Sequence, residues 1–482
     1  MSLLVADIGT SSVRGAVVRA DATVGCEHRH ANLPDSPAPG LVEFDAAAMA
    51  AAVLETTRAA LAEAGPGSVD ALGIANQRGS AVVWDRATGE PVAPGIGWQD
   101  LRTLGRCLEL RGTGFRFAPN MAATKFEAIL DAADPDRTRD LCLGTVDSWI
   151  TWVLSEGTVH VTDLSNAGIS GLIAIDGSSW DTDALTALRI APESLPELVD
   201  TTGVVGEARA LDGAPVLAAR VGDQQASLVG QGCVRPGSAK ITFGTGGMLD
   251  VCLGPDRPGF ATRGDAGTFP IVAWRAAGRD TWGIEAIMLS AGTNVEWLRD
   301  DLGLLASAAE SHDVAQQCTD SGGVWYVPAL LGLGTPQWDY GARGTVLGLT
   351  RGSGRAEIVR AVLEGVAHRG ADLVEAAEAD AGLTIPALRV DGGMTANPTF
   401  TQALADAAQK PVEISPVEEA TALGAGFLAG LAVGTWAGED DLASTWEPRA
   451  RVDPGDALDR DRWREAVRRA EGWLGDLSAI DF

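Results

Sequence analysis

The sequence opens with the stretch Leu3-Leu4-Val5-Ala6-Asp7-Ile8-Gly9-Thr10-Ser11-Ser12-Val13-Arg14, which decides the fold. An apolar run ends at Asp7, a polar turn follows, and the residues from Val13 to Val18 have the pattern of a second strand. Dinucleotide-binding and Walker A motifs place a helix after their glycine-rich turn. Because a strand follows here, the stretch predicts a β-hairpin with a hydroxyl-rich tip.

The same pattern returns in the second half of the chain. An apolar run at 239–243 leads into Gly244-Thr245-Gly246-Gly247, and another strand-like run follows at 248–252. The two tips lie almost half of the 482 residues apart. The repeat suggests a duplicated α/β fold with a cleft between the halves, although two short similarities leave chance resemblance open. We expect domains at 1–235 and 236–482.

Several further elements are expected from the pattern of apolar residues. A strand at 81–85 is expected to pair with residues just after the turn 87–90. Strands that alternate with helices indicate α/β or α+β layers. Helices are predicted at 46–63, 356–377, 398–409, 418–430 and near 459–474.

The composition limits the classes of function. Asp and Glu number 65 against 37 Lys and Arg, so the net charge is −28. A surface this acidic repels phosphate backbones and anionic lipids, and we expect neither nucleic acid nor a membrane as a partner. The uncharged segment 420–438 contains five glycines, which favours a helix packed under a sheet over a membrane span. Six scattered cysteines without a CxxC pair, and no signal-peptide pattern, favour the cytoplasm.

The first hairpin is a candidate site for metal and phosphate. A carboxylate at a strand end, such as Asp7, can hold Mg²⁺ through water, and the N–H and hydroxyl groups of a turn can bind phosphate oxygens. Arg14 would add charge-assisted contacts. Asp, Gly, Thr and Ser are also ordinary turn residues, so a purely structural turn is the alternative here and at Gly244–Gly247.

Two helix starts carry polar residues with two possible roles. Asp223, in Gly222-Asp223-Gln224-Gln225, can stabilise the start of a helix or accept a proton from a hydroxyl that attacks a phosphoryl group. Asn397-Pro398 is a clear capping pattern, and the helix start beside Gly393 could also receive a ribose or phosphate.

A group of polar and aromatic residues follows a strand that is predicted at 71–75. Arg78 lies just after that strand, and Trp98, Gln99, Asp100 and Arg102 follow within 25 residues. Trp rings cover the C–H faces of sugars and polyols, while charged groups bind the hydroxyls. Core tryptophan with surface ion pairs is the alternative.

Together these residues resemble the FGGY family of carbohydrate kinases, most closely its glycerol kinase branch. The resemblance runs from Leu4 to about Trp436 and includes a C-terminal signature at 344–364. It implies an actin-like, ribonuclease-H-like fold in each half, with ATP and Mg²⁺ in the cleft between them. The stretches that carry it are 7–14, 76–100, 144–149, 222–225, 243–246 and 391–394.

The resemblance also implies roles for single residues. Asp223 becomes the general base, and Asp7 and Asp223 become the partners of Mg²⁺. Glu296 stands where glycerol kinases usually carry Gln. The nucleotide contacts are expected at Thr10, Ser11, Ser12, Arg14, Thr245, Gly292, Glu296, Gly393 and Asn397.

The acceptor pocket departs from glycerol kinases at two positions. Gly79 follows Arg78 where they carry Glu, and Asn120 stands where they carry Tyr. Each lost hydrogen bond would cost an acceptor hydroxyl roughly 0.5–3 kcal/mol. A wider pocket is therefore expected, for a longer polyol or a ketose. The expected acceptor contacts are Arg78, Gly79, Trp98, Asn120, Asp223 and Gln224.

We therefore predict an ATP-dependent kinase that phosphorylates a hydroxyl of a small polyol or ketose. A glycerol kinase with a modified pocket is the first alternative. A non-enzymatic actin-like ATP-binding protein is the second, and a sugar sensor with an inactive kinase fold is the third. Family members are often homodimers or homotetramers, and the resemblance implies one of these assemblies for this chain.

Overall fold

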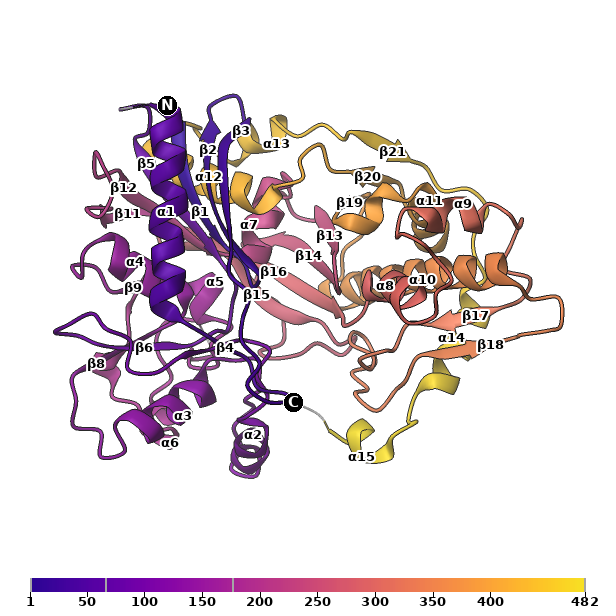
Figure 1. Ribbon diagram of the computed structural model, residues 1–482, viewed down its shortest axis with the longest axis horizontal. Helices are drawn as coiled ribbons and strands as arrows, with labels where there is room; N and C mark the ends of the chain where they lie inside the picture. The colour runs from indigo at the N-terminus through magenta and orange to yellow at the C-terminus, as the bar shows by residue number, and fades with distance from the viewer. Residues whose placement is uncertain (1, 66, 176, 481–482) are drawn as a thin grey trace.

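The computed structural model describes residues 2–65, 67–175 and 177–480. Within these residues thirteen strands form one mixed sheet, which runs through both halves of the molecule (Figure 1). The order of the strands in that sheet is β21-β20-β19-β13-β14-β16-β15-β11-β12-β5-β1-β2-β3.

The N-terminal half contributes a five-stranded unit that starts with the predicted hairpin. In this unit β1 pairs antiparallel with β2 and parallel with β5, and β5 pairs parallel with β12. Helix α1 contacts β1, β2 and β3, and Asp45 caps its first turn. The elements are β1 (Ser2–Ile8), β2 (Ser12–Arg19), β3 (Val24–Ala31), α1 (Ala46–Ala64), β5 (Ala71–Asn76) and β12 (Val216–Gly222).

The C-terminal half repeats this unit. Here β13 pairs antiparallel with β14 and parallel with β19, which pairs parallel with β20. The order β16-β14-β13-β19-β20 thus matches the order β3-β2-β1-β5-β12, and the prediction of a duplicated α/β fold is confirmed. The elements are β13 (Ala239–Phe243), β14 (Gly247–Gly254), β16 (Arg279–Met288), α10 (Arg355–Ala381), β19 (Leu388–Asp391) and β20 (Val412–Ile414).

Two helices that occupy equivalent places in the halves cross each other at glycines. These are α7 (Asp223–Gly230) and α12 (Ala420–Val433). A Cβ atom on Gly230 would lie 1.9 Å from the carbonyl oxygen of Ala420, and a Cβ on Gly424 would lie 1.8 Å from that of Ala226. Only glycine permits so close an approach of the two backbones.

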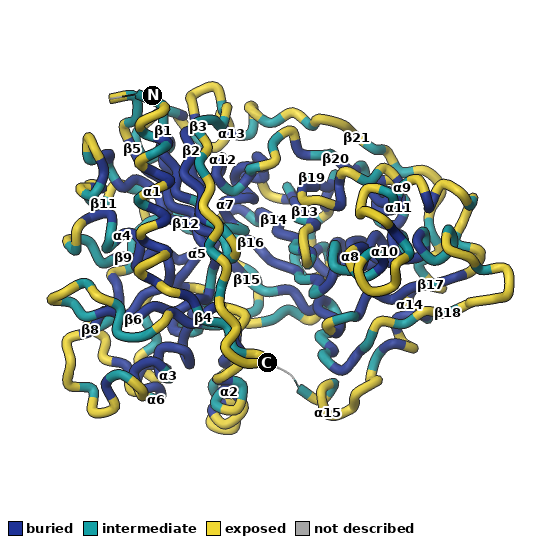
Figure 2. The backbone as a smooth tube through the Cα atoms, viewed as in Figure 1, coloured by how far each residue is buried: buried dark blue, intermediate teal, exposed yellow. Residues whose placement is uncertain are grey.

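Helix α12 also covers a face of the N-terminal sheet. It contacts β1, β5 and β12, and Phe427 and Leu428 belong to the same apolar core as Leu3 and Val5. Figure 2 shows this part of the molecule in dark blue, as buried. The prediction of a helix packed under a sheet is therefore confirmed, and no helix among the described residues is long and apolar enough to cross a membrane.

The remaining helices and strands connect the two halves or form the lobes at the two ends of the molecule. The predicted pairing of the strand at 81–85 is confirmed only in part: residues after the turn form the antiparallel bridges Trp84–Pro91 and Ala81–Ile96, while β6 pairs along its length with the distant β8. The elements in the N-terminal half are β4 (Glu43–Phe44), β6 (Val82–Asp85), β7 (Gly95–Ile96), α2 (Leu104–Arg111), α3 (Ala123–Ala133), β8 (Leu141–Gly144), α4 (Val146–Leu154), β9 (Val161–Asp163), α5 (Leu164–Ala167), α6 (Thr182–Ala187), β10 (Glu197–Val199) and β11 (Thr202–Glu207). Those in the C-terminal half are β15 (Phe269–Ala276), α8 (Thr293–Asp300), α9 (Glu310–Ala315), β17 (Trp325–Val327), β18 (Thr345–Leu347), α11 (Pro398–Ala408), α13 (Glu439–Ser444), β21 (Ala450–Val452), α14 (Arg460–Ala470) and α15 (Gly475–Ser478).

The glycine crossing predicts the effect of a single methyl group. Gly424→Ala should lower the apparent free energy of unfolding by roughly 1–3 kcal/mol, because the new Cβ overlaps the backbone of α7. Gly105→Ala is the matched control: Gly105 is exposed in α2 with no atom within 4 Å of its Cβ position. That change should be neutral or stabilise the protein by up to about 1 kcal/mol. Urea unfolding of both variants measures the difference, and equal effects would contradict the tight crossing.

Candidate functional site

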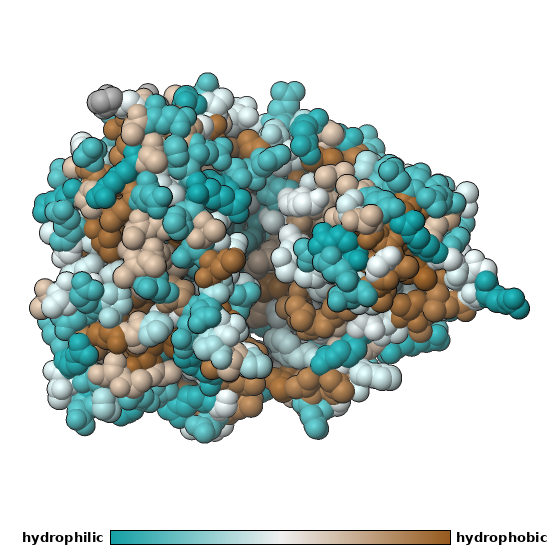
Figure 3. All heavy atoms as spheres, viewed as in Figure 1, coloured by the Kyte–Doolittle hydropathy of each residue, from teal (hydrophilic) through white to brown (hydrophobic). Residues whose placement is uncertain are grey.

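The predicted catalytic and metal-binding residues arrive at one edge of the sheet. Parallel strands β1, β5 and β12 end in register, with Ile8 opposite Asn76 and Asn76 opposite Gly222. The carboxyl ends of parallel strands are where ligands bind in open α/β sheets. Strand β13 likewise ends beside β19 in the other half. Figure 3 shows the surface hollowed into a groove between the two halves.

Asp223 is the first residue of α7, and Gly222 before it is in extended conformation. Its carboxylate Oδ1 lies 3.6 Å from Nε of Arg78, and the side chain is 28 % exposed. Burial raises the pKa of Asp223, while the Arg78 guanidinium opposes that rise. The carboxylate therefore keeps an exposed oxygen surface beside a fixed cation, which suits a group that accepts a proton.

Asp7 lies close enough to Asp223 for the two charges to interact. Burial raises the pKa of Asp7 to about 6, with repulsion from Asp223 adding to the rise and Arg14 opposing it. Two carboxylates facing one site favour a divalent cation, and Mg²⁺ typically takes one or two carboxylates plus water and phosphate oxygens. This pair therefore fits Mg²⁺, although among the described residues no three His, Cys, Asp or Glu side chains converge as a metal site.

The first hairpin tip forms a tight turn with exposed hydroxyls. The N–H of Gly9 donates to the carbonyl oxygen of Ser12 at 2.9 Å, and Ser11 is exposed. The indole Nε1 of Trp98 donates to Oγ1 of Thr10 at 3.0 Å, which joins the tip to one of the predicted acceptor contacts. Arg14 forms ion pairs with Asp7, Glu27 and Glu419, and its contact with a nucleotide stays a prediction.

The second tip brings together three of the predicted nucleotide contacts. The N–H of Gly292 donates to the carbonyl oxygen of Gly244 at 2.8 Å, and that of Ala291 donates to Thr245 at 2.8 Å. A Cβ on Gly292 would lie 3.9 Å from Cγ of Met394, which is next to the exposed Gly393. Thr245, Gly292 and Gly393 therefore border one surface that carries little side-chain bulk.

The other two predicted nucleotide contacts differ in their surroundings. Glu296 is exposed in the first turn of α8. Asn397 acts as the cap of α11: its Oδ1 accepts from the N–H of Phe400 at 3.1 Å, and its Nδ2 donates to Oγ of Ser311 at 2.9 Å. The capping interpretation of Asn397-Pro398 is thus confirmed, and contact with a nucleotide stays a prediction for both residues.

On the acceptor side, Gly79 packs directly against Asn120. Gly79 has a φ of +72°, and a Cβ there would lie 2.2 Å from the carbonyl oxygen of Asn120 and 3.6 Å from Cβ of Trp98. The absent Glu side chain therefore leaves no space along its own Cβ direction. Any widening of the pocket comes from Asn120, which is exposed and smaller than Tyr.

A buried lysine holds the backbone of both Gly79 and Asn120 in place. Nζ of Lys125 donates to the carbonyl oxygen of Gly79 at 2.9 Å and to that of Asn120 at 3.3 Å. Burial lowers the pKa of Lys125 from 10.5 to about 7. Lys125 thus ties together the backbone of Gly79 and Asn120, two of the predicted acceptor contacts.

The sequence interpretation missed three buried charges in the C-terminal half. Lys240, Asp250 and Glu285 lie directly opposite one another on the adjacent strands β13, β14 and β16. Lys240 and Asp250 are fully buried and Glu285 is 5 % exposed. A charged residue inside each of three apolar strands was the available signal, because unpaired charges are rarely buried.

These charges reach the predicted acceptor residues. Nη2 of Arg78 donates to Oε2 of Glu285 at 2.6 Å, and Nζ of Lys240 donates to Oε1 of Gln224 at 2.7 Å. Asp250 pairs with Lys240 at 2.8 Å. Burial raises the pKa of Glu285 to about 7, with Arg78 opposing the rise.

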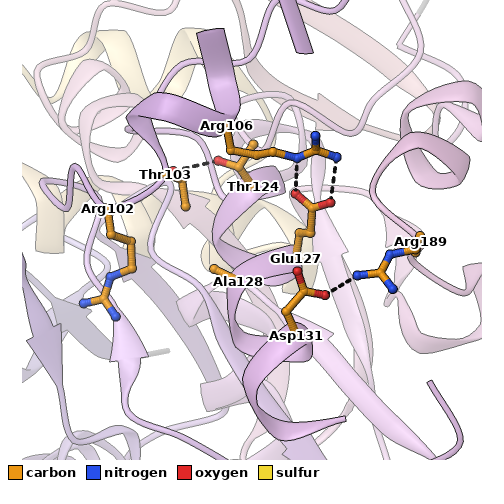
Figure 4. A pocket seen from close by; sticks show the side chains of 8 residues that line it. All are labelled: Arg102, Thr103, Arg106, Thr124, Glu127, Ala128, Asp131 and Arg189. Carbon is orange, nitrogen blue, oxygen red and sulfur yellow. Dashed lines mark hydrogen bonds and ion pairs between the residues drawn. The ribbon is translucent and has the colours of Figure 1, made fainter. Parts of the chain in front are cut away.

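A cavity of about 530 Å³ lies apart from these strand ends, between α2 and α3 (Figure 4). Arg106 and Glu127 form two hydrogen bonds of 2.9 Å across it, and Arg189 forms an ion pair with Asp131. Because the arginines that line it are already paired with carboxylates, we assign the chemistry to the strand ends.

Comparison with known proteins agrees with this geometry. Residues 2–230 match the N-terminal domain of the FGGY family of carbohydrate kinases, and residues 239–433 match its C-terminal domain. The chain is 41 % identical to a glycerol kinase of Aromatoleum aromaticum, over 98 % of this chain and 99 % of that protein. It is 42 % identical to a glycerol kinase of Trichlorobacter lovleyi, with the same coverage of both chains.

Solved structures show the same fold. A crystal structure of Plasmodium falciparum glycerol kinase with ADP superposes with a TM-score of 0.88 at 25 % identity, covering 100 % of this chain and 99 % of that one. Xylulose kinase from Rhodospirillum rubrum superposes with a TM-score of 0.86 at 21 % identity, covering 100 % of both chains. The chain therefore belongs to the FGGY family of carbohydrate kinases, ATP-dependent enzymes that phosphorylate an alcohol group of a sugar or polyol.

Proposed function

We propose that this kinase phosphorylates a polyol or ketose with more than three carbons, with Asp223 as the general base. The observation that supports this proposal most is the position of Asp223, beside Arg78 and within electrostatic reach of Asp7, where the strands of one half end. A base for phosphoryl transfer must face both the acceptor hydroxyl and the phosphate-binding tips.

In this proposal each acceptor-binding and phosphate-binding residue has a defined role. Arg78 and Gln224 hold hydroxyls of the acceptor, and Asp223 accepts the proton of the hydroxyl that attacks. The two hairpin tips, with Thr10, Ser11, Ser12 and Thr245, hold the phosphates of ATP and exclude water from them. Arg14 would support the first tip through Asp7.

The other proposed contacts complete the nucleotide and metal sites. Mg²⁺, when bound, neutralises charge on the transferred phosphoryl group, and Asp7 and Asp223 would hold it. Gly292, Glu296, Gly393 and Asn397 would border the nucleoside. Gly79, Trp98 and Asn120 would form the wall of the acceptor pocket.

The acceptor class follows from what the pocket lacks and from its charge. The Glu and Tyr of glycerol kinases are replaced by Gly79 and Asn120, so a three-carbon polyol would lose two partners. Three carboxylates, Asp223, Asp250 and Glu285, face two cations around the acceptor residues. This surplus of negative charge disfavours sugar acids as acceptors.

Glycerol is the second candidate acceptor. The chain shares 41 % and 42 % identity with two curated glycerol kinases over nearly its full length. In that case other side chains would replace the two missing partners of glycerol.

The domain boundary, the compartment and the assembly are part of the proposal. Domains 1–235 and 236–482 are supported by the repeated strand order and by the separate family matches in each half. Free, buried thiols such as Cys107 and Cys142 support the cytoplasm. A homodimer or homotetramer rests on the family resemblance alone and is checked by sedimentation.

An acceptor panel tests the proposed class. We expect coupled ADP release with erythritol, ribitol and D-xylulose to exceed that with glycerol, and D-gluconate to give none. The comparison uses kcat/KM at saturating ATP, with ATP alone as the blank. Glycerol as the best acceptor would refute the preference for longer chains, and slow ADP release unaffected by any acceptor would favour a non-enzymatic ATP-binding protein.

The base assignment is tested by Asp223→Asn. Loss of the proton acceptor should lower kcat by about 10²–10⁴-fold while ADP binding without Mg²⁺, measured by calorimetry, stays unchanged. Asp183→Asn is the control, because Asp183 is likewise an acidic residue in the first turn of a helix, but lies in α6 away from the strand ends. Near-normal turnover in Asp223→Asn would remove the general base from the mechanism.

The buried amine of Lys125 predicts a pH-dependent stability. Its folded pKa of about 7 lies below the value of 10.5 from which burial lowers it, so the unfolded chain binds the proton more tightly between these values. The part of the stability that depends on Lys125 should therefore rise as pH increases from about 7 toward 10, and should level off at its lowest value below about pH 7. Lys125→Met should remove that part of the slope. Urea unfolding of both proteins at pH 6, 8 and 10 measures it, and parallel pH profiles would contradict the burial of a titrating amine.

A further inference from the structure

We propose that Lys240, Asp250 and Glu285 form a positioning cluster, by which the C-terminal half fixes the two acceptor-binding side chains of the N-terminal half. The inference rests on the proposed function, because it takes Arg78 and Gln224 as acceptor contacts. It assigns a role to three residues that contact neither acceptor nor nucleotide in that proposal.

The cluster is built into the sheet. Lys240 faces Asp250 in the pairing of β13 with β14, and Asp250 faces Glu285 in the pairing of β14 with β16. Residues directly opposite each other on neighbouring strands point to the same face of a sheet. The three side chains therefore form a row whose spacing is set by backbone hydrogen bonds.

Glu285 determines where the guanidinium of Arg78 lies. Nη2 of Arg78 is bonded to Glu285 at 2.6 Å, and its Nε lies 3.6 Å from Asp223. A Cβ on Gly222 would lie 2.5 Å from Cδ of Arg78, so the stem of the arginine fills the space above that glycine. Nη1 is buried and has no hydrogen-bond partner within the described residues, which leaves it as the donor for an acceptor hydroxyl.

Lys240 determines which way the amide of Gln224 points. An ammonium group only donates hydrogen bonds, so the atom of Gln224 that faces it at 2.7 Å is the carbonyl oxygen Oε1. The amide Nε2 must then point away from Lys240. The acceptor consequently meets two outward donors, from Arg78 and Gln224, beside the carboxylate of Asp223.

The charges of the cluster leave Asp223 as the unmatched carboxylate. Arg78 pairs with Glu285, and Lys240 pairs with Asp250. Neither pair involves Asp223. Among the residues that the structure describes, Asp223 makes a 3.6 Å ion pair with Arg78 and accepts a hydrogen bond from the N–H of Gln224 at 2.9 Å. Without Glu285, Arg78 would turn to Asp223 as its nearest remaining carboxylate and occupy the proton acceptor.

The first test removes the carboxylate that holds Arg78. Glu285→Ala should raise the KM for erythritol, D-xylulose or glycerol by about tenfold or more, because one hydrogen bond to a charged group can change an affinity by that factor. The KM for ATP should stay unchanged. Glu285→Gln, which keeps an oxygen for Nη2, should recover part of the loss, a rescue that a merely structural role would not show.

The matched control is Glu127→Ala. Glu127 is also buried and bonds an arginine, Arg106, through two contacts of 2.9 Å, but it lies on α3 away from the strand ends. This variant should lose stability without a change in either KM. An equal rise of the acceptor KM in both variants, or none in Glu285→Ala, would overturn the proposal.

The second test concerns Lys240, whose removal alone would leave Asp250 buried and unpaired. The double variant Lys240→Met/Asp250→Leu removes both charges and keeps similar volume. We expect it to fold, to bind ADP as the wild type does and to have a raised acceptor KM. A folded double variant with a normal acceptor KM would refute the role of Lys240.

A third readout does not depend on any acceptor. A crystal structure of Glu285→Ala should show the guanidinium of Arg78 displaced toward Asp223, and an unmoved guanidinium would overturn the proposal. Failure of the proposed function has a different signature: the wild type would release no ADP with any acceptor of the panel, whatever position Arg78 adopts in the variant.

Discussion

The close crossing of α7 and α12 is the constraint on which the site depends. Helix α7 begins at Asp223 and ends at Gly230, where it meets the backbone of α12. Because the two helices belong to equivalent places in the two halves, their contact fixes one half against the other. The crossing also fixes the start of α7 over the strand ends. Gly230 lies about 10 Å from Asp223 along the helix axis, at about 1.5 Å per residue. The distance from Asp223 to Arg78 therefore depends on helix packing at the far end of α7.

Much of the fold could be predicted from the sequence because its strongest signals are local. The run that ends at Asp7, the hydroxyl-rich turn and the repeat at Gly244–Gly247 each predict a hairpin, and two hairpins predict two halves. The prediction was incomplete at residues 81–85, where a distant strand pairs more extensively than the residues after the local turn. For β6, pairing with β8 places Trp84 beside Trp149 in a buried aromatic group, which a short local hairpin could not provide.

The candidate site divides in the same way. Asp7, Arg78 and Asp223 could be found because each lies at the end of a strand or just after it, and these strand ends converge. The sequence interpretation missed Lys240, Asp250 and Glu285 because each lies inside a strand. An apolar pattern is expected there, and a single charged residue does not by itself indicate a site. Their meaning depends on register across three strands, and no local pattern in the sequence determines that register.

The contact between Gly79 and Asn120 limits which substitutions residue 79 can accept. The missing carboxylate cannot be regained by one codon change, since any Cβ at residue 79 collides with a peptide group and requires positive φ. The loop around residue 120 would have to move first, and Lys125 anchors that loop. In the proposed acceptor pocket, main-chain geometry would therefore set the range of substrates, and changing that range would require replacing the loop and not a single residue.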